Sequence, residues 1–428
     1  MKRVLLIAHD FPPRGGTGVL RVAKFVRYLP DWGWEPVVIT AAGRGPYPDD
    51  RLLQDLPAGL EVVRVPVPGV PQPGTPPGGS VVIRGGGNDW RQRLKPWIVP
   101  DPQILWVPWA VRAAHARLRN GDIQALMTSA PPFSTSLTGW WLKRRNPTLP
   151  WLMDLRDLWS ESSLQHQLVP YKLNRFLEQQ CLSSADHTTV VSDGIRTLTI
   201  KQLGVEPERI STLTNGFDPN DLPADLPVPD RVSTRWGTSE PLRMRYVGSI
   251  GAARAPDFRV LFEALRQLPA EGLGAEQLRI EFVGAYAQTI HDWVAPLVRA
   301  GLVVLHPFVP HDHAVRYMAD ADVLMLFLTN DWEGRIAHSN KLFEYLAVGR
   351  PILAIAPEGE VTQLVRDEQA GIMAPHDPAA IVRAITSLVA RHRAGALSQP
   401  APNNRRFSRF ERRALAGQLA ARLDALVR

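Results

Sequence analysis

The sequence predicts an α/β protein with two tandem Rossmann-like domains. Short apolar segments alternate with amphipathic stretches along most of the 428 residues, a pattern typical of parallel sheets covered by helices. A chain of this length is too long for one ordinary hydrophobic core, so about two domains are expected. The alternation begins twice, at the N-terminus and again near Arg243, after a stretch rich in Pro and Asp. These observations predict two sheets joined by a linker.

The first series of strands and helices extends from the N-terminus to about Val191. Its apolar segments predict strands at Val4–Ala8, Pro36–Thr40, Glu61–Val65, Ile123–Thr128, Trp151–Asp154 and Thr188–Val191. The periodicity of Gly18–Leu29 predicts the first helix. Pro66–Asp89 is rich in Pro and Gly, and we interpret it as a mobile, functional loop, with a low-complexity linker as the alternative.

The second series follows a predicted linker at residues 219–240. A helix is expected over Phe258–Leu268, and leucines four residues apart predict a final amphipathic helix within Phe407–Arg428. The domains are therefore predicted as 1–218, 241–400 and a C-terminal segment 401–428. The expected strands are Leu242–Val247, Arg279–Val283, Leu302–Leu305, Val323–Phe327, Ile352–Ile355 and Gly371–Met373.

Composition excludes several classes of protein. The chain is 45% hydrophobic and 21% charged, which is globular, and its single cysteine, Cys181, excludes an internal disulfide framework. Met1–Ala8 is too short for a signal peptide and fits a buried strand, and no apolar run approaches the length of a membrane span. We therefore expect a cytoplasmic protein, with peripheral attachment to the inner face of the membrane as a variant of that location.

The net charge of +7 favours anionic partners. No dense block of Lys and Arg is present, so we expect no nucleic acid partner, and phosphorylated small molecules or an anionic membrane surface fit better. A solvated basic face without a partner is the alternative.

The segment 337–352 carries the most specific pattern. Ser339 or Asn340 is placed to cap a short helix that Gly349 ends. Lys341 and Glu344 are three residues apart and share one helical face near the N-terminus, where anions are favoured. A cation and a carboxylate in that position suit a phosphate and a sugar hydroxyl, and so predict a nucleotide-sugar site.

One glycine-rich turn follows the first strand of each of the two series. Gly15, Gly16 and Gly18 precede the first helix, and Gly248-Ser249 follows the strand at Leu242–Val247, with Arg254 nearby. Glycines let a backbone approach a phosphate closely, although ordinary tight turns would show the same residues. Neither turn has the G-x-G-x-x-G spacing, which argues against a dinucleotide oxidoreductase, and no metal-ligand spacing is present.

Several stretches, in order, carry a resemblance to a known family. The chain resembles, over essentially its whole length, the retaining nucleotide-sugar glycosyltransferases of GT-B type, family four, and among them bacterial enzymes of surface-polysaccharide synthesis. The matching stretches are the Phe-Pro-Pro opening at residues 11–13, Met153–Trp159, Val191–Gly194, Thr214–Asp218, Tyr246–Gly248 and Lys341–Ala347.

The resemblance implies a donor site on the second domain and an acceptor side on the first. Glu344 would bind the donor ribose, and Lys341 and Arg254 the diphosphate, with these three as the catalytic set. Gly248, Ser249, Glu333, Gly334, His338, Ser339 and Asn340 would complete the donor site, with Phe308 and Val309 against the base. Gly15, Gly16 and Gly18 would leave room for donor and acceptor. The final helix is expected to return to the first domain, and the family uses no metal or cofactor.

Two positions depart from the family pattern. Ile336 replaces a glutamate that binds the transferred sugar, and Phe133 stands where a histidine is common. Glu333 is the nearest carboxylate to Ile336 in sequence. Asp154 and Arg156 end a predicted strand at the edge that lines ligand crevices, so they are predicted acceptor contacts, with a structural Asp–Arg pair as the alternative.

Tryptophans concentrate in the first domain, which holds ten of the 13 within its first 159 residues. Trp90, Trp97, Trp106 and Trp109 lie beside basic residues, as at a lipid headgroup interface, and core packing is the alternative reading. The expected function is transfer of a sugar from a nucleotide-diphospho-sugar, UDP-linked by preference, to a glycan, lipid-linked or small-molecule hydroxyl with retention. The alternatives are a catalytically degenerate binding protein and a sugar-nucleotide synthase of the same fold.

Overall fold

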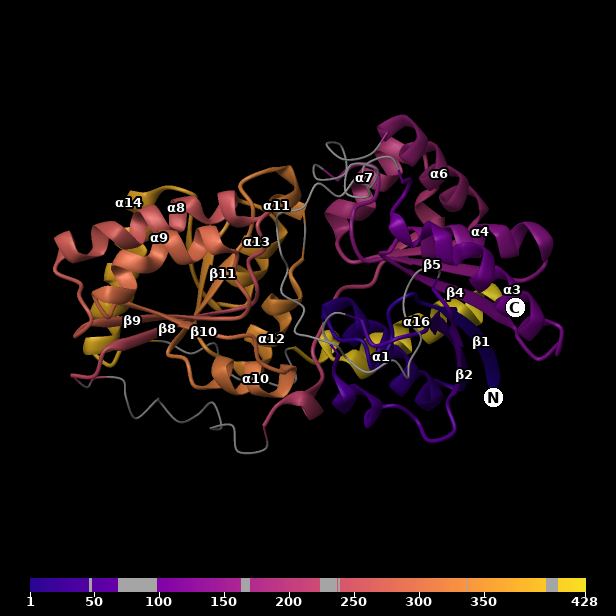
Figure 1. The fold of residues 1–428 in the computed structure, drawn as a ribbon, viewed down its shortest axis with the longest axis horizontal. Coiled ribbons are helices and arrows are strands. Elements are labelled where there is room, and N and C mark those ends of the chain that lie inside the picture. Colours follow the sequence, from indigo (N-terminus) through magenta and orange to yellow (C-terminus); the bar gives the residue numbers. More distant parts are fainter. Residues whose placement is uncertain are drawn as a thin grey trace. The chain divides into compact units, whose positions relative to one another are not determined.

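The computed structural model describes residues 1–45, 48–67, 98–162, 170–223, 237, 239–336, 338–397 and 407–428. They form two compact units, one of Met1–Thr214 with Arg412–Arg428 and one of Asn215–Glu411 (Figure 1). Each unit contains one parallel sheet covered by helices, which confirms the predicted α/β class with two tandem Rossmann-like domains. The predicted loop 66–89 lies almost wholly outside the described residues, as does most of the predicted linker.

The first unit has a seven-stranded parallel sheet in the order β3-β2-β1-β4-β5-β6-β7. Its strands are β1 Lys2–Ile7, β2 Trp34–Ala41, β3 Glu61–Val65, β4 Ala125–Ala130, β5 Trp151–Leu155, β6 His187–Val190 and β7 Ile210–Thr212. Its helices are α1 Thr17–Tyr28, α3 Val107–Leu118, α4 Ser134–Arg145, α6 Tyr171–Ser184, α7 Asp193–Leu203 and α16 Arg412–Leu426. The edge strand β7 was not predicted, because three residues are too few to show an alternating pattern.

The chain order explains which helices cover which face of this sheet. Right-handed crossovers place α1 on one face, and α3, α4 and α6 on the other, because the strand order reverses direction at β1. The C-terminal helix α16 packs on α1. Asp424 on α16 accepts a hydrogen bond from the indole of Trp34 at 2.9 Å and pairs with Lys2, so α16 is tied to β1 and β2.

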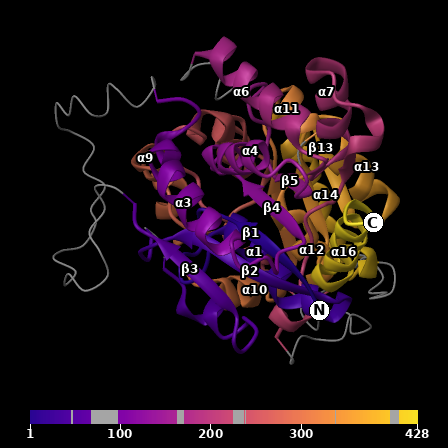
Figure 2. The same cartoon turned by 90° about the vertical axis from the view of Figure 1, so that its right-hand side faces the viewer.

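The second unit has a six-stranded parallel sheet in the order β10-β9-β8-β11-β12-β13. Its strands are β8 Leu242–Val247, β9 Leu278–Val283, β10 Val303–His306, β11 Val323–Phe327, β12 Ile352–Ile355 and β13 Gly371–Ala374. Its helices are α8 Arg259–Gln267, α9 Gln288–Arg299, α10 His311–Ala319, α11 Trp332–Ile336, α12 Asn340–Val348, α13 Glu360–Asp367 and α14 Pro378–Arg393. Figure 2 turns the same ribbon by 90°.

Two apolar clusters fill the two faces of the second sheet. One joins the sheet to α8, α9 and α14, and the other joins it to α10, α12 and α13. The second cluster also includes Phe217, Phe407 and Phe410, so the chain stays with this unit until just before α16 begins. Because α12 lies against the second cluster, its first turn is held at the carboxyl-terminal edge of the sheet.

Candidate functional site

A close approach of two glycines shapes the end of strand β8. Gly248 has a φ of 151° and donates its N–H to the Val283 carbonyl at 2.8 Å. A Cβ on Gly248 would collide with the end of the Lys341 side chain, and a Cβ on Gly284 would strike the Gly248 carbonyl. Glycine is therefore required at both positions to let β8, β9 and Lys341 meet.

Lys341 is placed at this turn by Tyr246. The ammonium Nζ donates to the Tyr246 hydroxyl at 2.8 Å and lies 4.5 Å from the centre of the same ring. Lys341 is half-buried in the first turn of α12, while Tyr246 comes from β8. The predicted phosphate-binding cation and the predicted glycine turn thus form one cluster.

Tyr345, which sequence analysis did not single out, fixes α12 against the sheet. Its hydroxyl accepts a hydrogen bond from the Val247 N–H at 3.2 Å and donates one to the Met325 carbonyl at 3.3 Å. The side chain is wholly buried, and burial raises the pKa of the Tyr345 phenol well above its usual range. The phenol stays protonated and holds α12 against β8 and β11. The backbone positions from which Lys341 and Glu344 extend are therefore fixed.

Glu344 faces a histidine that sequence analysis also missed. The Glu344 Oε1 lies 3.0 Å from the His311 Nε2, and the two side chains are 17% and 23% exposed. His311 is the first residue of α10, so its position on the first turn of a second helix brings it to the same edge of the sheet. The spacing of 33 residues between the two gave no sequence signal for this contact.

The start of α12 carries polar groups without internal partners. Among the residues that the structure describes, Ser339 is the N-cap residue without a capping hydrogen bond from its side chain, and the Asn340 Oδ1 is buried without a hydrogen-bond partner. The helix ends at Gly349, whose φ of 71° and bond from its N–H to the Tyr345 carbonyl confirm the predicted stop. His338 lies beside Glu360, with 3.0 Å between Nε2 and Oε2. The first-turn N–H groups of α12 can receive an anion.

Helix α11 forms a tight corner in front of α12. Gly334 is buried and donates its N–H to Asp331 at 2.8 Å, and a Cβ there would collide with the Thr329 carbonyl. Glu333 and Ile336 are both half-buried, in the first and last turns of this helix. Glu333 thus lies in the same short helix as the apolar Ile336, three residues before it.

The remaining predicted donor residues lie at the border of this cluster. Arg254 is 57% exposed and its nearest acid is Asp257, at 3.4 Å. Phe308 is 55% exposed after β10, whereas Val309 packs on the cluster that includes α12. The Ser249 hydroxyl accepts from the Ala285 N–H at 3.1 Å, so it fixes the glycine turn.

Two of the predicted acceptor residues of the first unit, Gly18 and Arg156, lie against each other. Gly16 has a φ of 116° before α1, and Gly18 lies against the Arg156 guanidinium, where a Cβ would collide with it. Arg156 donates to the Ala130 carbonyl at 3.1 Å and also to the Pro131 carbonyl. Burial lowers the pKa of Arg156 from its ordinary value.

Asp154 is wholly buried, and its partner is Arg21 instead of Arg156. Arg21 donates to both carboxylate oxygens, at 2.8 and 3.1 Å, and the hydroxyls of Ser129 and Thr189 each donate at 2.8 Å. Burial alone would raise the pKa of Asp154, but the Arg21 charge and these hydrogen bonds lower it overall. The enclosed carboxylate joins α1, β4, β5 and β6, so it acts as a structural ion pair.

The departure at Phe133 in the first unit is explained by packing. Phe133 is 4% exposed and stacks on Trp159 with 5.1 Å between ring centres, so it is a packing residue. His9, which sequence analysis missed, follows β1 with its Nδ1 at 3.0 Å from Asp10, and its Nε2 is buried with no hydrogen-bond partner among the described residues. Trp106 is wholly buried against His9, which contradicts its predicted membrane contact, while Trp109 is 48% exposed.

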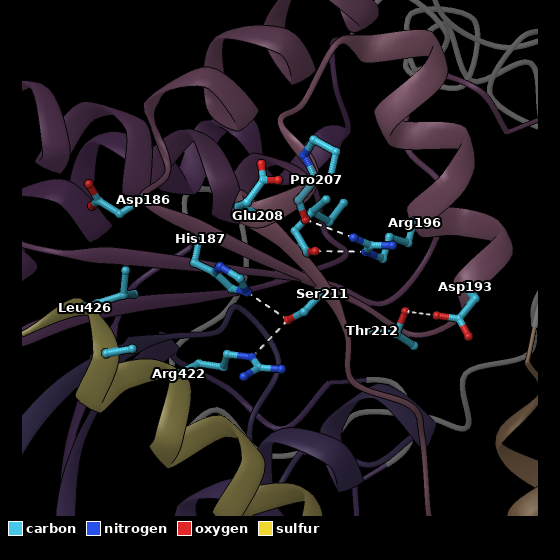
Figure 3. A pocket seen from close by; sticks show the side chains of 12 residues that line it. Asp186, His187, Asp193, Arg196, Pro207, Glu208, Ser211, Thr212, Arg422 and Leu426 are labelled. Atoms are coloured by element: carbon cyan, nitrogen blue, oxygen red, sulfur yellow. Dashed lines mark hydrogen bonds between the residues drawn. The ribbon is translucent and has the colours of Figure 1, made fainter.

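A separate hollow in the first unit is lined by residues of β6, β7, α7 and α16, none of which is a predicted site residue (Figure 3). Ser211 there contacts the His187 Nε2 at 2.8 Å and accepts from Arg422 at 3.2 Å. Burial, and then the charges of Arg422 and Arg209, lower the pKa of His187 to about 4. These polar groups satisfy one another, and we assign the hollow no ligand.

Two features are absent from the described ranges of the chain. No helix in them is long and apolar enough to cross a membrane. Within the same ranges, no cluster of three or more His, Cys, Asp or Glu side chains has the arrangement of a metal site.

Comparison with known proteins gives matches over both units. Residues 15–216 match the model of the glycosyl transferase 4-like domain, and residues 242–391 match that of the glycosyl transferases group 1. No curated protein sequence matches the chain.

Solved structures share the fold at low sequence identity. Sucrose-phosphate synthase from Thermosynechococcus elongatus is 19% identical, with a TM-score of 0.68 over 99% of this chain and 100% of that one. HepE from Anabaena, in complex with UDP and glucose, is 16% identical with a TM-score of 0.67 over 99% and 100%. WaaG, a glycosyltransferase of lipopolysaccharide biosynthesis, is 16% identical with a TM-score of 0.62 over 98% and 99%. With one domain model matched on each Rossmann-like unit, the chain belongs to the GT-B glycosyltransferases of group 1, family four.

Proposed function

We propose that this glycosyltransferase moves a sugar from a UDP-sugar to a hydroxyl of a glycan, lipid-linked or small-molecule acceptor, with retention and without a metal. The observation that carries the proposal is the pair Lys341 and Glu344 on one face of α12, each held by a partner from another element. A fixed ammonium suits a diphosphate, and a fixed carboxylate suits the two hydroxyls of a ribose. The UDP and UDP-glucose complexes of HepE, which has the same fold, support UDP as the donor nucleotide.

Stabilisation of the leaving diphosphate is the main catalytic contribution that these residues can supply. Negative charge grows on the diphosphate as the sugar departs, and Lys341, held by Tyr246, and the first-turn N–H groups of α12 would stabilise it. Arg254, exposed and only loosely paired with Asp257, has the freedom to add a second cation. Gly248 and Ser249 allow the diphosphate to approach the backbone, because neither projects a large side chain.

The transferred sugar would rest against the corner of α11. Ile336 offers no hydrogen bond, so Glu333, the backbone near Gly334, and the polar groups of His338, Ser339 and Asn340 would hold the sugar hydroxyls. Phe308 and Val309 would lie along the base, since they precede His311, the partner of Glu344. Retention follows if the departing phosphate oxygen takes the proton of the acceptor hydroxyl on the same face of the sugar.

On the first unit, Gly15, Gly16, Gly18 and Arg156 are the proposed acceptor contacts. The absence of a Cβ at Gly18 gives the Arg156 guanidinium its place next to the glycine turn. Asp154 is left out because its oxygens are enclosed and bonded. The proposed location is cytoplasmic, with peripheral binding to an anionic membrane surface where a lipid-linked acceptor is used.

The test is a thermal-shift panel of UDP, GDP, dTDP and ADP, followed by the corresponding sugar donors. A ligand at 100 times its Kd adds ~2.7 kcal/mol to stability, which is measurable for the second unit. UDP is expected to stabilise the wild type and to lose that effect in Lys341→Ala and Glu344→Ala, but not in the matched controls Lys201→Ala on α7 and Glu263→Ala on α8. Loss of one leaving-group donor should lower turnover ~10²–10³-fold. An unchanged response in both site variants would refute the assignment.

A binding protein without turnover is the second candidate. Ile336 and the buried Phe133 favour it, because the family's sugar carboxylate and its histidine are both missing. Saturable UDP binding, combined with no product and no slow donor hydrolysis across a panel of acceptors, would select this candidate over the transferase.

A further inference from the structure

A carboxylate reaches the corner of α11 from a different helix. Helix α11 ends at Ile336, and α13 begins at Glu360. A Cβ on Gly359 would collide with the backbone of Arg335, so the start of α13 lies directly against the last turn of α11. The two helices pack on each other in the second unit (Figure 1). Glu360 therefore extends from a point next to the turn that carries the apolar Ile336.

Backbone hydrogen bonds fix the start of α13. The Gly359 N–H donates to the Thr362 hydroxyl at 2.9 Å, and the Gly359 carbonyl accepts from the Gln363 N–H at 2.9 Å. Thr362 is buried, so this capping arrangement is enclosed. Because the backbone before it is held in this way, the Glu360 side chain begins from a defined position.

The Glu360 carboxylate lies beside His338, in the loop between α11 and α12. Its Oε2 is 3.0 Å from the His338 Nε2, and the His338 side chain is only 10% exposed. The contact is electrostatic, because neither ring nitrogen of His338 makes an in-line hydrogen bond to a described residue. On another side, the His338 ring meets that of the buried Phe343, with 5.9 Å between ring centres. The imidazole is thus held from two directions.

The carboxylate also selects which nitrogen of the neutral imidazole carries the proton. A lone pair on Nε2 would be repelled by the negative charge of Glu360, so the proton is favoured on Nε2. The Nδ1 of His338 is then a hydrogen-bond acceptor, and it has no donor among the described residues. The Asn340 Oδ1, also without a described partner, is a second acceptor at the same helix start.

The place of this pair along the sheet fits one end of the proposed donor. The strands are parallel in the order β10-β9-β8-β11-β12-β13, so their carboxyl ends follow one another along the ligand-binding edge. His311 lies after β10, Lys341 lies at the end of β8, and Glu360 lies after β12. With the ribose on the β10 side and the diphosphate at β8, the sugar extends toward β12.

We propose that Glu360 is a positioning residue for recognition of the transferred sugar, and that it holds His338 so that Nδ1 accepts a hydrogen bond from one sugar hydroxyl. An acceptor built by two elements then stands in for the carboxylate that is missing at Ile336. A single imidazole nitrogen accepts one hydrogen bond, so this corner selects a sugar by one hydroxyl donor. The inference rests on the proposed UDP-sugar donor and assigns the sugar end of the same site.

The experiment is isothermal titration calorimetry of the whole protein with UDP, UDP-glucose, UDP-galactose and UDP-N-acetylglucosamine. Wild type should prefer one of the three sugars. Glu360→Gln should bind UDP like wild type but lose about tenfold in affinity for the preferred UDP-sugar, as expected for one hydrogen bond. His338→Phe should lose the same factor, and the double variant no more, because the two residues act as one unit. The matched control is Glu358→Gln, the same change at a side chain that is 72% exposed, which should bind all four ligands like wild type.

A second measurement separates positioning from a structural role. The ¹⁵N signals of the His338 imidazole, identified by their loss in His338→Phe, should show a protonated Nε2 and a bare Nδ1 in wild type, and should lose that preference in Glu360→Gln. Unchanged UDP-sugar affinity in Glu360→Gln, an equal loss for UDP and the UDP-sugars, or an unaltered tautomer would overturn this inference and leave the donor assignment intact. Absence of UDP binding by wild type would overturn both.

Discussion

The imidazole Nε2 of His311 lies 3.0 Å from the carboxylate of Glu344, so one contact joins α10 to α12 at the edge of the second sheet. His311 opens α10 and Glu344 lies in the second turn of α12. A carboxylate that must bind two ribose hydroxyls gains from being oriented before the ligand arrives, since less side-chain freedom is then lost on binding.

We therefore predict that His311→Ala weakens UDP binding by roughly tenfold, the loss expected for one hydrogen bond to a charged group. Isothermal titration calorimetry would measure the affinity. The control is His313→Ala, an exposed position on the same helix. If both variants bind UDP as wild type does, the contact has no part in orienting Glu344.

A second prediction concerns the glycine turn at the end of β8. Gly248→Ala should both lower stability and weaken UDP binding, because its φ of 151° strains any other residue and its new methyl group would displace Lys341. The backbone strain alone is expected to cost about 1–3 kcal/mol. Urea denaturation and UDP titration measure the two effects.

Gly251→Ala is the matched control for that substitution. A Cβ at Gly251 meets nothing within 4 Å, and its φ is not in the positive range. The control should unfold and bind UDP like the wild type. Equal behaviour of the two alanine variants would mean that Lys341 does not depend on the space beside Gly248.

The fold class and most strands could be predicted from the sequence, because strands buried on both faces of a sheet form short apolar runs flanked by Gly and Pro. Leu242–Val247, Val323–Phe327 and Ile352–Ile355 were predicted to the residue. Lys341 and Gly248 were both predicted as donor-site residues from the family resemblance, and the structure places the end of the Lys341 side chain beside Gly248.

The partners that orient the site were not foreseeable. Tyr345 looks like any buried aromatic on a helix, and only the packing of α12 shows that its hydroxyl bonds two strands. Asp154 was expected beside Arg156 because they are close in sequence, yet its cation comes from Arg21, 133 residues away. Such contacts depend on tertiary structure, which local spacing does not report.

The Arg21–Asp154 pair leads to a third prediction, on stability. Asp154→Ala should destabilise the first unit by about 3–5 kcal/mol, because it leaves the buried Arg21 guanidinium without its charge partner. Tryptophan fluorescence during urea denaturation reports this unit, which holds ten of the 13 tryptophans within its first 159 residues.

Glu35→Ala provides the comparison for that variant. It breaks the exposed pair with Arg3, whose side chains are 35% and 44% accessible, and should cost less than about 1 kcal/mol. Similar losses in the two variants would contradict a structural role for the buried pair.

The fourth prediction is a fall in stability with rising pH that originates at Glu178. This carboxyl is 4% exposed on α6 and accepts hydrogen bonds from the Ser160 N–H at 2.9 Å and from the Ser160 hydroxyl. Burial raises its pKa from the ordinary 4.5 to about 7. The folded chain therefore keeps a proton that the unfolded chain has lost between these two values. Its contribution to stability is complete below the unfolded pKa and is lost as pH rises through the folded one.

The free energy of unfolding of the first unit should accordingly decrease between about pH 5 and pH 8, by roughly 2–4 kcal/mol from this group. Glu178→Gln, which resembles the protonated acid, should remove that decrease and be more stable than wild type at the alkaline end. Glu208→Gln, at an exposed position, should leave the wild-type profile unchanged. Urea denaturation followed by tryptophan fluorescence at several pH values measures all three proteins. A wild-type profile that is flat across this range, or one that the Glu178 substitution does not alter, would show that the buried carboxyl stays ionised.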